Sequence, residues 1–306
     1  MAGYTDLPFR RLAFEHGAAL AATEMVSVRG LIYNNAKTKD LMATHSIENP
    51  TCVQLFGNNP NDFLIAAKEG MLEKFDIVDI NMGCPMPKIT TNGDGSALIA
   101  NIKTAAAIVE TLAKCDITVT VKTRLGISNS DTKNTIEFCT ALQQAGAYAI
   151  VLHGRSAKQL YTGAADWQKI GEVADKIKIP VFGNGDVFAD NALELLKNCN
   201  IAGLMIGRGA LANPDIFNRI IAKDIKSTNK NSNIATHNII DIILKHIEYS
   251  KECFDSEKFI VHKLRKHFAY YLKNIKTSRQ TKVTLLTAES LELIENVVKT
   301  EFTNIN

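Results

Sequence analysis

The chain has 306 residues, of which 46% are hydrophobic and 22% charged, and its formal net charge is +3 at pH 7. These values are typical of a soluble globular protein and are too balanced to identify a partner by charge alone. No apolar run reaches the roughly 20 residues that a membrane helix needs, and no signal segment opens the chain.

The six cysteines are widely separated, and none of them forms a C-x-x-C pair. Their spacing therefore predicts neither a disulfide framework nor a zinc knuckle, and we expect no metal site. We interpret this cysteine usage as that of a protein in a reducing, cytoplasmic location. Separately, we expect no membrane contact and no obligatory protein partner.

Short β-branched runs alternate with helix-length segments over the first 210 or so residues. Strands that are apolar on both faces and are separated by helices indicate a parallel sheet covered by helices. The predicted fold class is α/β, a (β/α)8 TIM barrel whose first strand is missing or truncated; an open sheet of seven strands is the alternative. The predicted strands are 20–27, 51–57, 75–81, 117–126, 147–155, 179–186 and 201–209.

The pattern changes near residue 226. Residues 224–238 are polar and rich in Asn, Ser and Thr, which is typical of a linker. The segments 239–254, 256–275 and 287–302 have helical periodicity and no strand signal. We therefore predict a catalytic barrel over 1–226 and a small helical domain over 227–306.

Polar residues gather where the predicted strands end, and the carboxyl ends of barrel strands are where chemistry takes place. Two of these ends are rich in glycine, "GNGD" at 183–186 and "GRGAL" at 207–211. Such loops let backbone N–H groups approach a phosphate, to which Arg208 adds charge; the alternative is that the glycines only turn the chain. The other polar residues at these ends are Gln54, Asn81, Cys84, Lys122, Arg124, His153 and Arg155.

A lysine inside a buried strand needs a partner, because burying a bare ammonium is unfavourable. Lys122 is such a residue, and its partner is either a ligand or an internal carboxylate, Glu24 or Asp79. His153 could likewise be a hydrogen-bonded core histidine. Together with Gln54, these groups suit a planar phosphorylated cofactor such as FMN. Composition alone does not separate FMN from a sugar phosphate or pyridoxal phosphate.

Ordered motifs along residues 1–217 resemble those of the tRNA-dihydrouridine synthases, most closely their bacterial B-type branch. The helical tail also matches that family's C-terminal domain in size and position. The motifs are "MAGYTDLPFR", "TEMVS", "VQLFG", "DINMGCP", "GDGSAL", "VKTRLG", "HGR", "GNGDV" and "GLMIGRGAL" followed by "NP".

The resemblance implies an oxidoreductase that uses NADPH to reduce a tightly bound FMN, which then reduces the C5–C6 bond of uridines in the D-loop of tRNA. Cys84 corresponds to the family's proton donor and Asn81 to its neighbour at the target base, with Arg124 and Arg155 as further candidates for substrate contact. The resemblance assigns FMN binding to Met1, Ala2, Gly3, Gln54, Lys122, His153, Asn184, Gly185, Asp186, Gly207 and Arg208.

Hydride transfer to C6 leaves negative charge over C5 and O4, so C5 needs a proton from the opposite face. A cysteine thiol is mostly protonated at neutral pH and can act as that acid. Pro85 and Pro87 restrict the loop that carries Cys84.

Family members have a strand and "AP" before "MAG", so we expect the chain as given to have an unpaired barrel seam and to bind flavin poorly.

The predicted helix at 256–275 carries a basic face. Between residues 258 and 282 there are eight Lys or Arg and no Asp or Glu. We expect its apolar face to pack on neighbouring helices and its opposite face to bind tRNA, although a solvated surface is the plain alternative. The apolar face comprises Val261, Leu264, Phe268, Leu272 and Ile275; the tRNA-binding face comprises Lys263, Lys266, Tyr270 and Lys273.

Two other functions fit parts of this pattern. One is a flavin barrel that reduces a free pyrimidine, as dihydroorotate-type enzymes do, which leaves the basic tail unexplained. The other is an inactive, truncated RNA-binding homologue. The sequence does not specify which uridine is modified, whether rRNA is also a target, or the oligomeric state.

Overall fold

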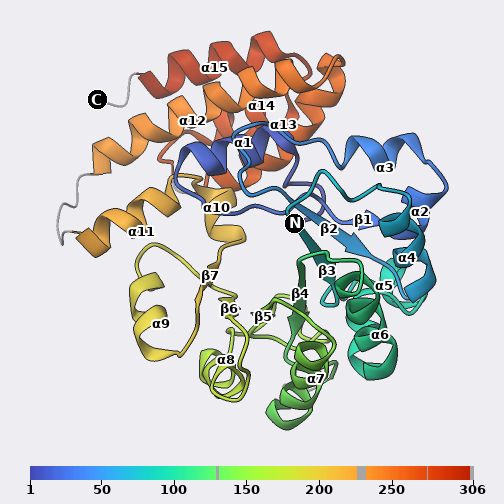
Figure 1. The fold of residues 1–306 in the computed structure, drawn as a ribbon. Coiled ribbons are helices and arrows are strands. Elements are labelled where there is room, and N and C mark those ends of the chain that lie inside the picture. The colour runs from blue at the N-terminus through green and yellow to red at the C-terminus, as the bar shows by residue number, and fades with distance from the viewer. Residues whose placement is uncertain (129–130, 226–231, 274, 304–306) are drawn as a thin grey trace. The chain divides into compact units, whose positions relative to one another are not determined.

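The computed structural model describes residues 1–128, 131–225, 232–273 and 275–303 (Figure 1). The chain divides into two compact units. We call Ala22–Thr44 with Asn49–Gly207 the sheet unit, and Met1–Ala21, His45–Glu48 and Arg208–Asn306 the helical unit. Each is described by itself.

The sheet unit contains seven parallel strands, each paired with the next one along the chain. All seven predicted strands are present, with shorter bounds than predicted. This strand order is that of a barrel, with β1 and β7 at the two edges of the paired strands. The strands are β1 (Val26–Ser27), β2 (Cys52–Phe56), β3 (Ile77–Asn81), β4 (Val119–Arg124), β5 (Ala149–His153), β6 (Val181–Asn184) and β7 (Gly203–Met205).

Helices connect successive strands of this unit, and α6 to α9 lie on the outer side of the strands in Figure 1. The strands are buried on both faces: Val53, Ile80 and Val121 on one face are completely inaccessible, and Asp79 and Asn81 on the other are buried as well. The alternation of strand and helix segments predicted from the sequence is therefore present, and the predicted α/β class is confirmed. The helices are α2 (Val28–Ile32), α3 (Ala36–Asp40), α4 (Pro60–Lys68), α5 (Pro87–Thr90), α6 (Ile102–Ala113), α7 (Thr132–Gln144), α8 (Trp167–Ala174) and α9 (Ala192–Asn198), with a 3-10 helix at Gly95–Ala100.

Several of these helices begin at an acidic capping residue. The Asp131 carboxylate accepts the backbone N–H of Asn134 at the start of α7, and Asp166 accepts that of Lys169 at the start of α8. An acidic cap satisfies a backbone donor that has no partner within the helix and complements the positive end of the helix dipole.

The helical unit consists of α1 (Leu7–Glu15) and the helices that follow β7. The three predicted tail helices are present, but α14 was not predicted, and α12 begins at Ser232, inside the segment predicted as a linker. Residues 226–231 of that segment lie outside the described residues. The later helices are α10 (Arg208–Ala212), α11 (Ile216–Ile225), α12 (Ser232–Cys253), α13 (Glu257–Tyr271), α14 (Arg279–Thr287) and α15 (Leu291–Thr303).

The first helix belongs to the core of this unit. Leu12 of α1 is completely buried in one cluster with Ile243 of α12 and Phe268 of α13. Glu15 adds polar contacts to α12, where it accepts from Lys245 at 3.0 Å and from the Tyr249 hydroxyl. The division into two compact units therefore does not fall at residue 226. The predicted functional division into a catalytic barrel over 1–226 and a tRNA-binding domain over 227–306 stays a prediction.

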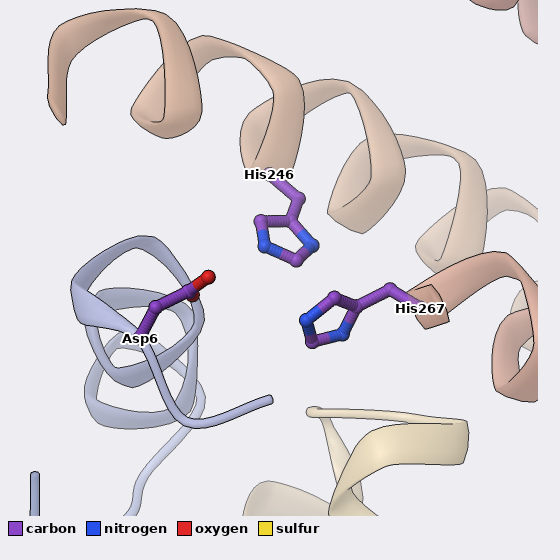
Figure 2. Close-up of side chains that lie close together, drawn as sticks. All are labelled: Asp6, His246 and His267. Atoms are coloured by element: carbon purple, nitrogen blue, oxygen red, sulfur yellow. The ribbon is translucent and has the colours of Figure 1, made fainter. Parts of the chain in front are cut away.

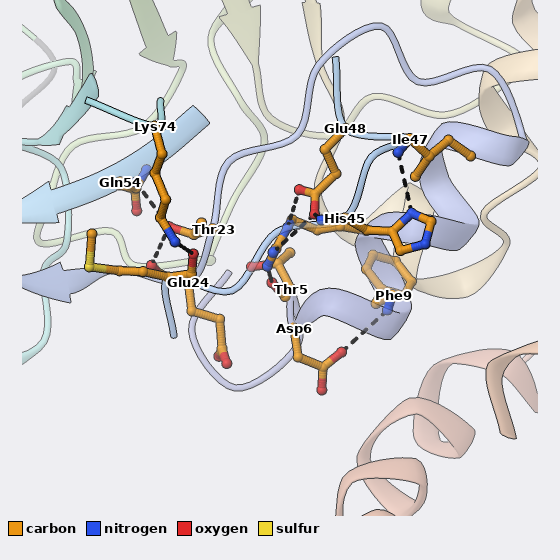
Figure 3. A network of polar contacts seen from close by, with 12 residues as sticks. Thr5, Asp6, Phe9, Thr23, Glu24, His45, Ile47, Glu48, Gln54 and Lys74 are labelled. Carbon is orange, nitrogen blue, oxygen red and sulfur yellow. Dashed lines mark hydrogen bonds and ion pairs between the residues drawn. The ribbon is translucent and has the colours of Figure 1, made fainter. Parts of the chain in front are cut away.

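A short segment, His45–Glu48, joins α1 through a buried ion pair. The Glu48 carboxylate accepts from the Arg10 guanidinium at 2.7 Å and from the His45 backbone N–H at 3.0 Å (Figure 3). Arg10 also donates to the carbonyl oxygen of Thr5 at 2.8 Å. Both charges are therefore neutralised and hydrogen-bonded, which burial requires.

Within the described residues, no helix combines the length and apolar character needed to cross a membrane.

Candidate functional site

Cys84 lies three residues beyond the end of β3, and its side chain is half-buried. The loop that carries it is held by the last residue of the strand. The Asn81 Oδ1 atom accepts the backbone N–H of Gly83 at 3.2 Å and that of Cys84 at 2.8 Å. The sulfur is therefore attached to a backbone whose donors are fixed by one side chain.

The other side of this loop is held by the segment "GDGSAL". The Ser96 backbone N–H donates to the Cys84 carbonyl oxygen at 3.0 Å. Gly95 has φ of +60°, and a Cβ at this position would lie 2.7 Å from the same oxygen. Glycine is required here because both the backbone conformation and the close approach exclude a side chain.

A buried chain of polar side chains lies behind Asn81. Asn81 Nδ2 donates to Gln54 Oε1 at 2.9 Å, and Gln54 Nε2 donates to Asp79 Oδ2 at 2.7 Å. The Thr120 hydroxyl donates to the second Asp79 oxygen at 2.7 Å. The backbone N–H of Gln54 also donates to the Thr23 hydroxyl at 3.0 Å (Figure 3). Asp79, through Gln54, thus orients the amide that holds the cysteine loop.

This role of Asp79 was missed by sequence reasoning, which considered it only as a partner of Lys122. Burial raises the pKa of the Asp79 carboxyl, and the hydrogen bonds from Thr120 and Gln54 oppose that rise. The available signal was the alternation of the strand, which places Asp79 and Asn81 on one face of β3.

Lys122 lies opposite Asn81 in the ladder between β3 and β4. Burial lowers the pKa of Lys122 to about 7, the Arg124 guanidinium acts in the same direction, and the Asp79 carboxylate opposes both. Asp79 does not compensate the loss of solvation, so the internal ion pair considered from the sequence is insufficient. An anionic group beside Lys122 would restore its charge.

Arg124 and Arg155 are buried and donate mainly to backbone oxygens. Arg124 donates to Gly83 at 2.9 Å and, from Nη1, to Ser156 at 3.0 Å and Leu160 at 2.9 Å. Burial lowers the pKa of Arg124. These contacts join the loop after β3 to the loop after β5, which favours a positioning role. Substrate contact by Arg124 stays a prediction.

Arg155 connects the ends of β5 and β6. It donates to the Gly163 carbonyl oxygen at 2.6 Å and to the Asp186 carboxylate at 2.5 Å. Its Nη1 atom lies 3.3 Å from His153 Nε2, and because a guanidinium only donates, that nitrogen is the acceptor. The substrate contact predicted for Arg155 stays a prediction.

The "GNGD" loop adjoins His153, which faces Asn184 in the β5–β6 ladder. Gly185 has φ of +117°, and a Cβ there would lie 2.8 Å from His153 Cδ2. Asn184 Nδ2 donates to the Met205 carbonyl oxygen at 2.7 Å, and the Asp186 carboxylate accepts the Ala165 N–H at 2.9 Å. The loop is thus built from contacts that keep its backbone close to the imidazole.

The remaining predicted cofactor residues are divided between the units. Gly207 ends the sheet unit, whereas Arg208 begins α10 of the helical unit. Met1, Ala2 and Gly3 also belong to the helical unit, where the Met1 carbonyl oxygen accepts the Tyr4 N–H at 3.0 Å. The sheet unit therefore groups Gln54, Asn81, Cys84 and Lys122 at one side and His153, Arg155, Asn184, Gly185 and Asp186 at the other; a joint site with Met1, Ala2, Gly3 and Arg208 stays a prediction.

The predicted basic face lies on and just after α13. Its apolar counterpart is buried as predicted, from Val261 to Ile275. Lys263 differs from the prediction, because its Nζ lies 3.3 Å from Asp6 Oδ2 and only 14% of its side chain is exposed. Lys266 and Tyr270 are partly accessible, and the exposed Lys273 places its ammonium 4.7 Å from the Tyr270 ring centroid. Their contact with tRNA stays a prediction.

Comparison with known proteins identifies relatives along the entire chain. A family model described as dihydrouridine synthase (Dus) matches residues 1–305. The chain is 36% identical over 277 residues to probable tRNA-dihydrouridine synthase 1 of Synechocystis sp., covering 90% of this chain and 77% of that one. It is 31% identical over 307 residues to tRNA-dihydrouridine synthase B of Vibrio parahaemolyticus, covering 100% and 94%.

Among solved structures, a crystal structure of TcOYE with pHBA matches with a TM-score of 0.53 and 11% identity, covering 71% of this chain and 83% of that one. At that identity the likeness concerns the fold alone. The family resemblance predicted from the motifs is confirmed by the match to nearly every residue. The chain therefore belongs to the dihydrouridine synthase family.

Proposed function

We propose that this protein reduces the C5–C6 double bond of a uridine in the D-loop of tRNA, with FMN as its cofactor and NADPH as the reductant. The observation that carries the proposal is the position of Cys84: its thiol follows β3 on a loop fixed by Asn81, whose strand neighbour is Lys122. Family membership supplies the reaction class, since the relatives are named tRNA-dihydrouridine synthases.

The residues of the sheet unit suit a flavin. Gly185 brings the backbone of its loop against His153, where a Cβ would lie 2.8 Å from the ring, and Lys122 has a pKa of about 7 that an adjacent anionic group would raise. When bound, FMN supplies the hydride. Its ring and phosphate would be held by Gln54, Lys122, His153, Asn184, Gly185, Asp186 and Gly207. The family resemblance adds Met1, Ala2, Gly3 and Arg208 to this set.

Cys84 would supply the proton. Hydride addition at C6 of the uracil leaves an electron pair shared between C5 and O4, and a new C–H bond at C5 forms as the thiol S–H bond breaks. The resulting thiolate is reprotonated from water. Proton transfer to carbon needs a donor held within reach, which the paired contacts of Asn81 Oδ1 and Ser96 N–H with the loop provide.

Replacement of the thiol tests this role. Cys84→Ala should bind flavin as the parent protein does and be reduced by NADPH, while dihydrouridine formation in tRNA transcripts falls about 10²- to 10⁴-fold. Cys115→Ala is the matched control, because Cys115 is also half-buried but precedes β4, at the opposite end of the strands. Equal turnover of Cys84→Ala and Cys115→Ala would remove Cys84 from the reaction.

The basic residues of α13 provide the argument for tRNA. Reduction of a base within folded RNA requires that the base leave its stack, and cationic side chains that bind phosphates position the RNA for that step. Lys266 and Lys273 are accessible for such contacts, whereas Lys263 is engaged by Asp6.

Charge reversal at these positions tests the substrate class. The double variant Lys266→Glu with Lys273→Glu should weaken tRNA binding and flatten its dependence on salt, while the flavin spectrum is unchanged. A matched control is Lys178→Glu, an exposed lysine of the sheet unit. Reduction of free uracil or orotate at a rate unaffected by the double variant would instead identify a reductase of free pyrimidines.

A further inference from the structure

Three side chains of metal-ligating type meet inside the helical unit, outside every residue assigned above to the reaction. Asp6 precedes α1, His246 lies on α12 and His267 on α13. One ligand atom from each lies within 4.8 Å of the other two. Figure 2 shows the carboxylate and the two imidazole rings directed toward one another. We propose that Asp6, His246 and His267 form a binding site for a divalent transition-metal ion of the zinc type.

His267 is the residue that most needs an explanation. It is completely buried, and neither of its ring nitrogens makes a hydrogen bond of normal geometry within the described residues, although the Tyr4 backbone lies beside the ring. A buried polar atom without a partner destabilises the fold, so such atoms are rare in folded proteins. A metal ion bound to one nitrogen would satisfy it.

His246 has the arrangement expected of a metal ligand with a supporting partner. Its Nδ1 atom lies 2.9 Å from the Tyr271 hydroxyl, in the buried core of the unit. Ligating histidines usually have their second nitrogen hydrogen-bonded in this way, which fixes the orientation of the ring. Nε2 of His246 is then the atom available to a metal.

The donor set indicates the class of ion. Two imidazoles and a carboxylate suit zinc and the neighbouring divalent transition metals, and a fourth position would be taken by water. Ligand atoms around a tetrahedral zinc are about 3.4 Å apart at bond lengths near 2.1 Å. The 4.8 Å limit of the cluster is wider than this, so the three side chains must move closer together when an ion binds.

Lys263 is the competing cation. Its ammonium lies 3.3 Å from Asp6 Oδ2, and the other Asp6 oxygen accepts the Phe9 N–H at 3.3 Å. A metal must therefore replace Lys263 at the carboxylate and tolerate its positive charge nearby. Removal of that charge should strengthen metal binding, which a purely structural histidine cluster would not do.

The site would join three segments that are far apart in the sequence. A metal that binds the folded unit and not the unfolded chain stabilises the fold by mass action. The rival interpretation is aromatic packing: the rings of His246 and His267 meet edge to face with centroids 4.5 Å apart, and Phe9 packs on His267 at 5.1 Å.

The experiment uses the untagged full chain, stripped with a chelator and dialysed. Zinc titration by calorimetry should show one ion per chain, and added Co²⁺ should give the visible absorption of a tetrahedral site. His267→Gln should weaken zinc binding at least about tenfold. The matched control is His262→Gln, an exposed histidine on the same helix, which should bind zinc like the parent protein.

A variant that binds zinc more tightly than the parent protein must be folded, so it tests the proposal even if His267→Gln fails to fold. Lys263→Met should bind zinc more tightly than the parent, with far-UV circular dichroism unchanged. Absence of stoichiometric zinc or cobalt binding by the parent protein overturns the proposal and leaves the aromatic packing. Equal affinity of the parent and a folded His267→Gln also overturns it.

Discussion

At the scale of single residues, the most unusual group of the sheet unit is the Lys122 ammonium. Its pKa is lowered to about 7 by burial and by Arg124, against the opposing effect of Asp79. In the unfolded chain a lysine titrates near pH 10.4. The folded protein therefore binds fewer protons than the unfolded chain between these two values.

This difference predicts a dependence of stability on pH. In flavin-free protein the free energy of unfolding should increase as pH rises from about 7 to about 10, because the unfolded state binds more protons there. The contribution of Lys122 is at most about 1.4 kcal/mol per pH unit. The measurement is urea denaturation across this pH range.

Lys122→Met should remove that contribution, so its stability relative to the parent is largest at the low end of the range and declines as pH rises. Lys178→Met, at an exposed position, is the control. If the two variants show the same pH dependence, the lowered pKa of Lys122 is wrong.

At the scale of elements, the loop after β3 is defined by the strands on either side of it. Asn81 holds two N–H groups of the loop, and the chain from Asp79 through Gln54 holds Asn81. A hydrogen-bonded network of this kind orients a reacting group more accurately than a free loop does, and a misplacement of about 1 Å can cost about 10²-fold in rate.

Two substitutions at Asn81 separate its roles. Asn81→Ala removes the acceptor of both loop N–H groups and should lower turnover by about 10²-fold with the flavin retained. Asn81→Asp keeps that acceptor but cannot donate to Gln54, so it should recover part of the loss. Single-turnover oxidation of the reduced enzyme by tRNA measures the effect.

Gly95→Ala provides an independent test, because it disturbs the same loop from the Ser96 side without touching Asn81. It should also slow turnover, whereas Gly163→Ala, at a similar positive φ where an added Cβ meets only Gln159 Nε2 at 3.8 Å, should not. A normal rate for Gly95→Ala would show that the loop position is not critical for proton transfer.

At the scale of the whole molecule, the helical unit depends on a helix from the opposite end of the chain. Leu12 of α1 is completely buried in the core formed with α12 and α13. Leu12→Ala should therefore lower the free energy of unfolding of this unit by about 2–5 kcal/mol. Val283→Ala on α14, where 46% of the residue is exposed, is the control and should change it by less than about 1 kcal/mol.

Hydrogen exchange of the α13 amides locates the effect. Protection of α13 should decrease in Leu12→Ala and stay unchanged in Val283→Ala. Loss of protection confined to the sheet unit would contradict the assignment of α1 to the helical core.

Much of the fold follows from local pattern. The seven strands are recognisable because parallel strands buried on both faces leave short continuous apolar runs, and the helices between them begin at acidic caps such as Asp131. The missed features are of another kind. Residues 279–287 have weak helical periodicity, and the grouping of α1 with the tail is a contact between distant segments.

In the candidate site, too, local sequence patterns predicted some residues, whereas contacts between distant segments were missed. Cys84, Asn81, Lys122 and His153 were predicted because each is an unusual residue at a strand end, and family motifs gave them roles. Asp79 was missed, because its function is to hold Gln54 through a hydrogen bond across two strands. Lys263 was predicted on a solvent face, whereas Asp6, 257 positions away by residue numbering, pairs with it in the folded chain.

Periodicity and short contiguous motifs are enough to predict the α/β class, the family and the residue types at the strand ends. The pairing of charges, the contacts that hold each loop, and the meeting of His246 and His267 with Asp6 are visible in the folded chain alone. Those properties depend on distances between segments that are remote in the chain, and a linear pattern carries no such distances.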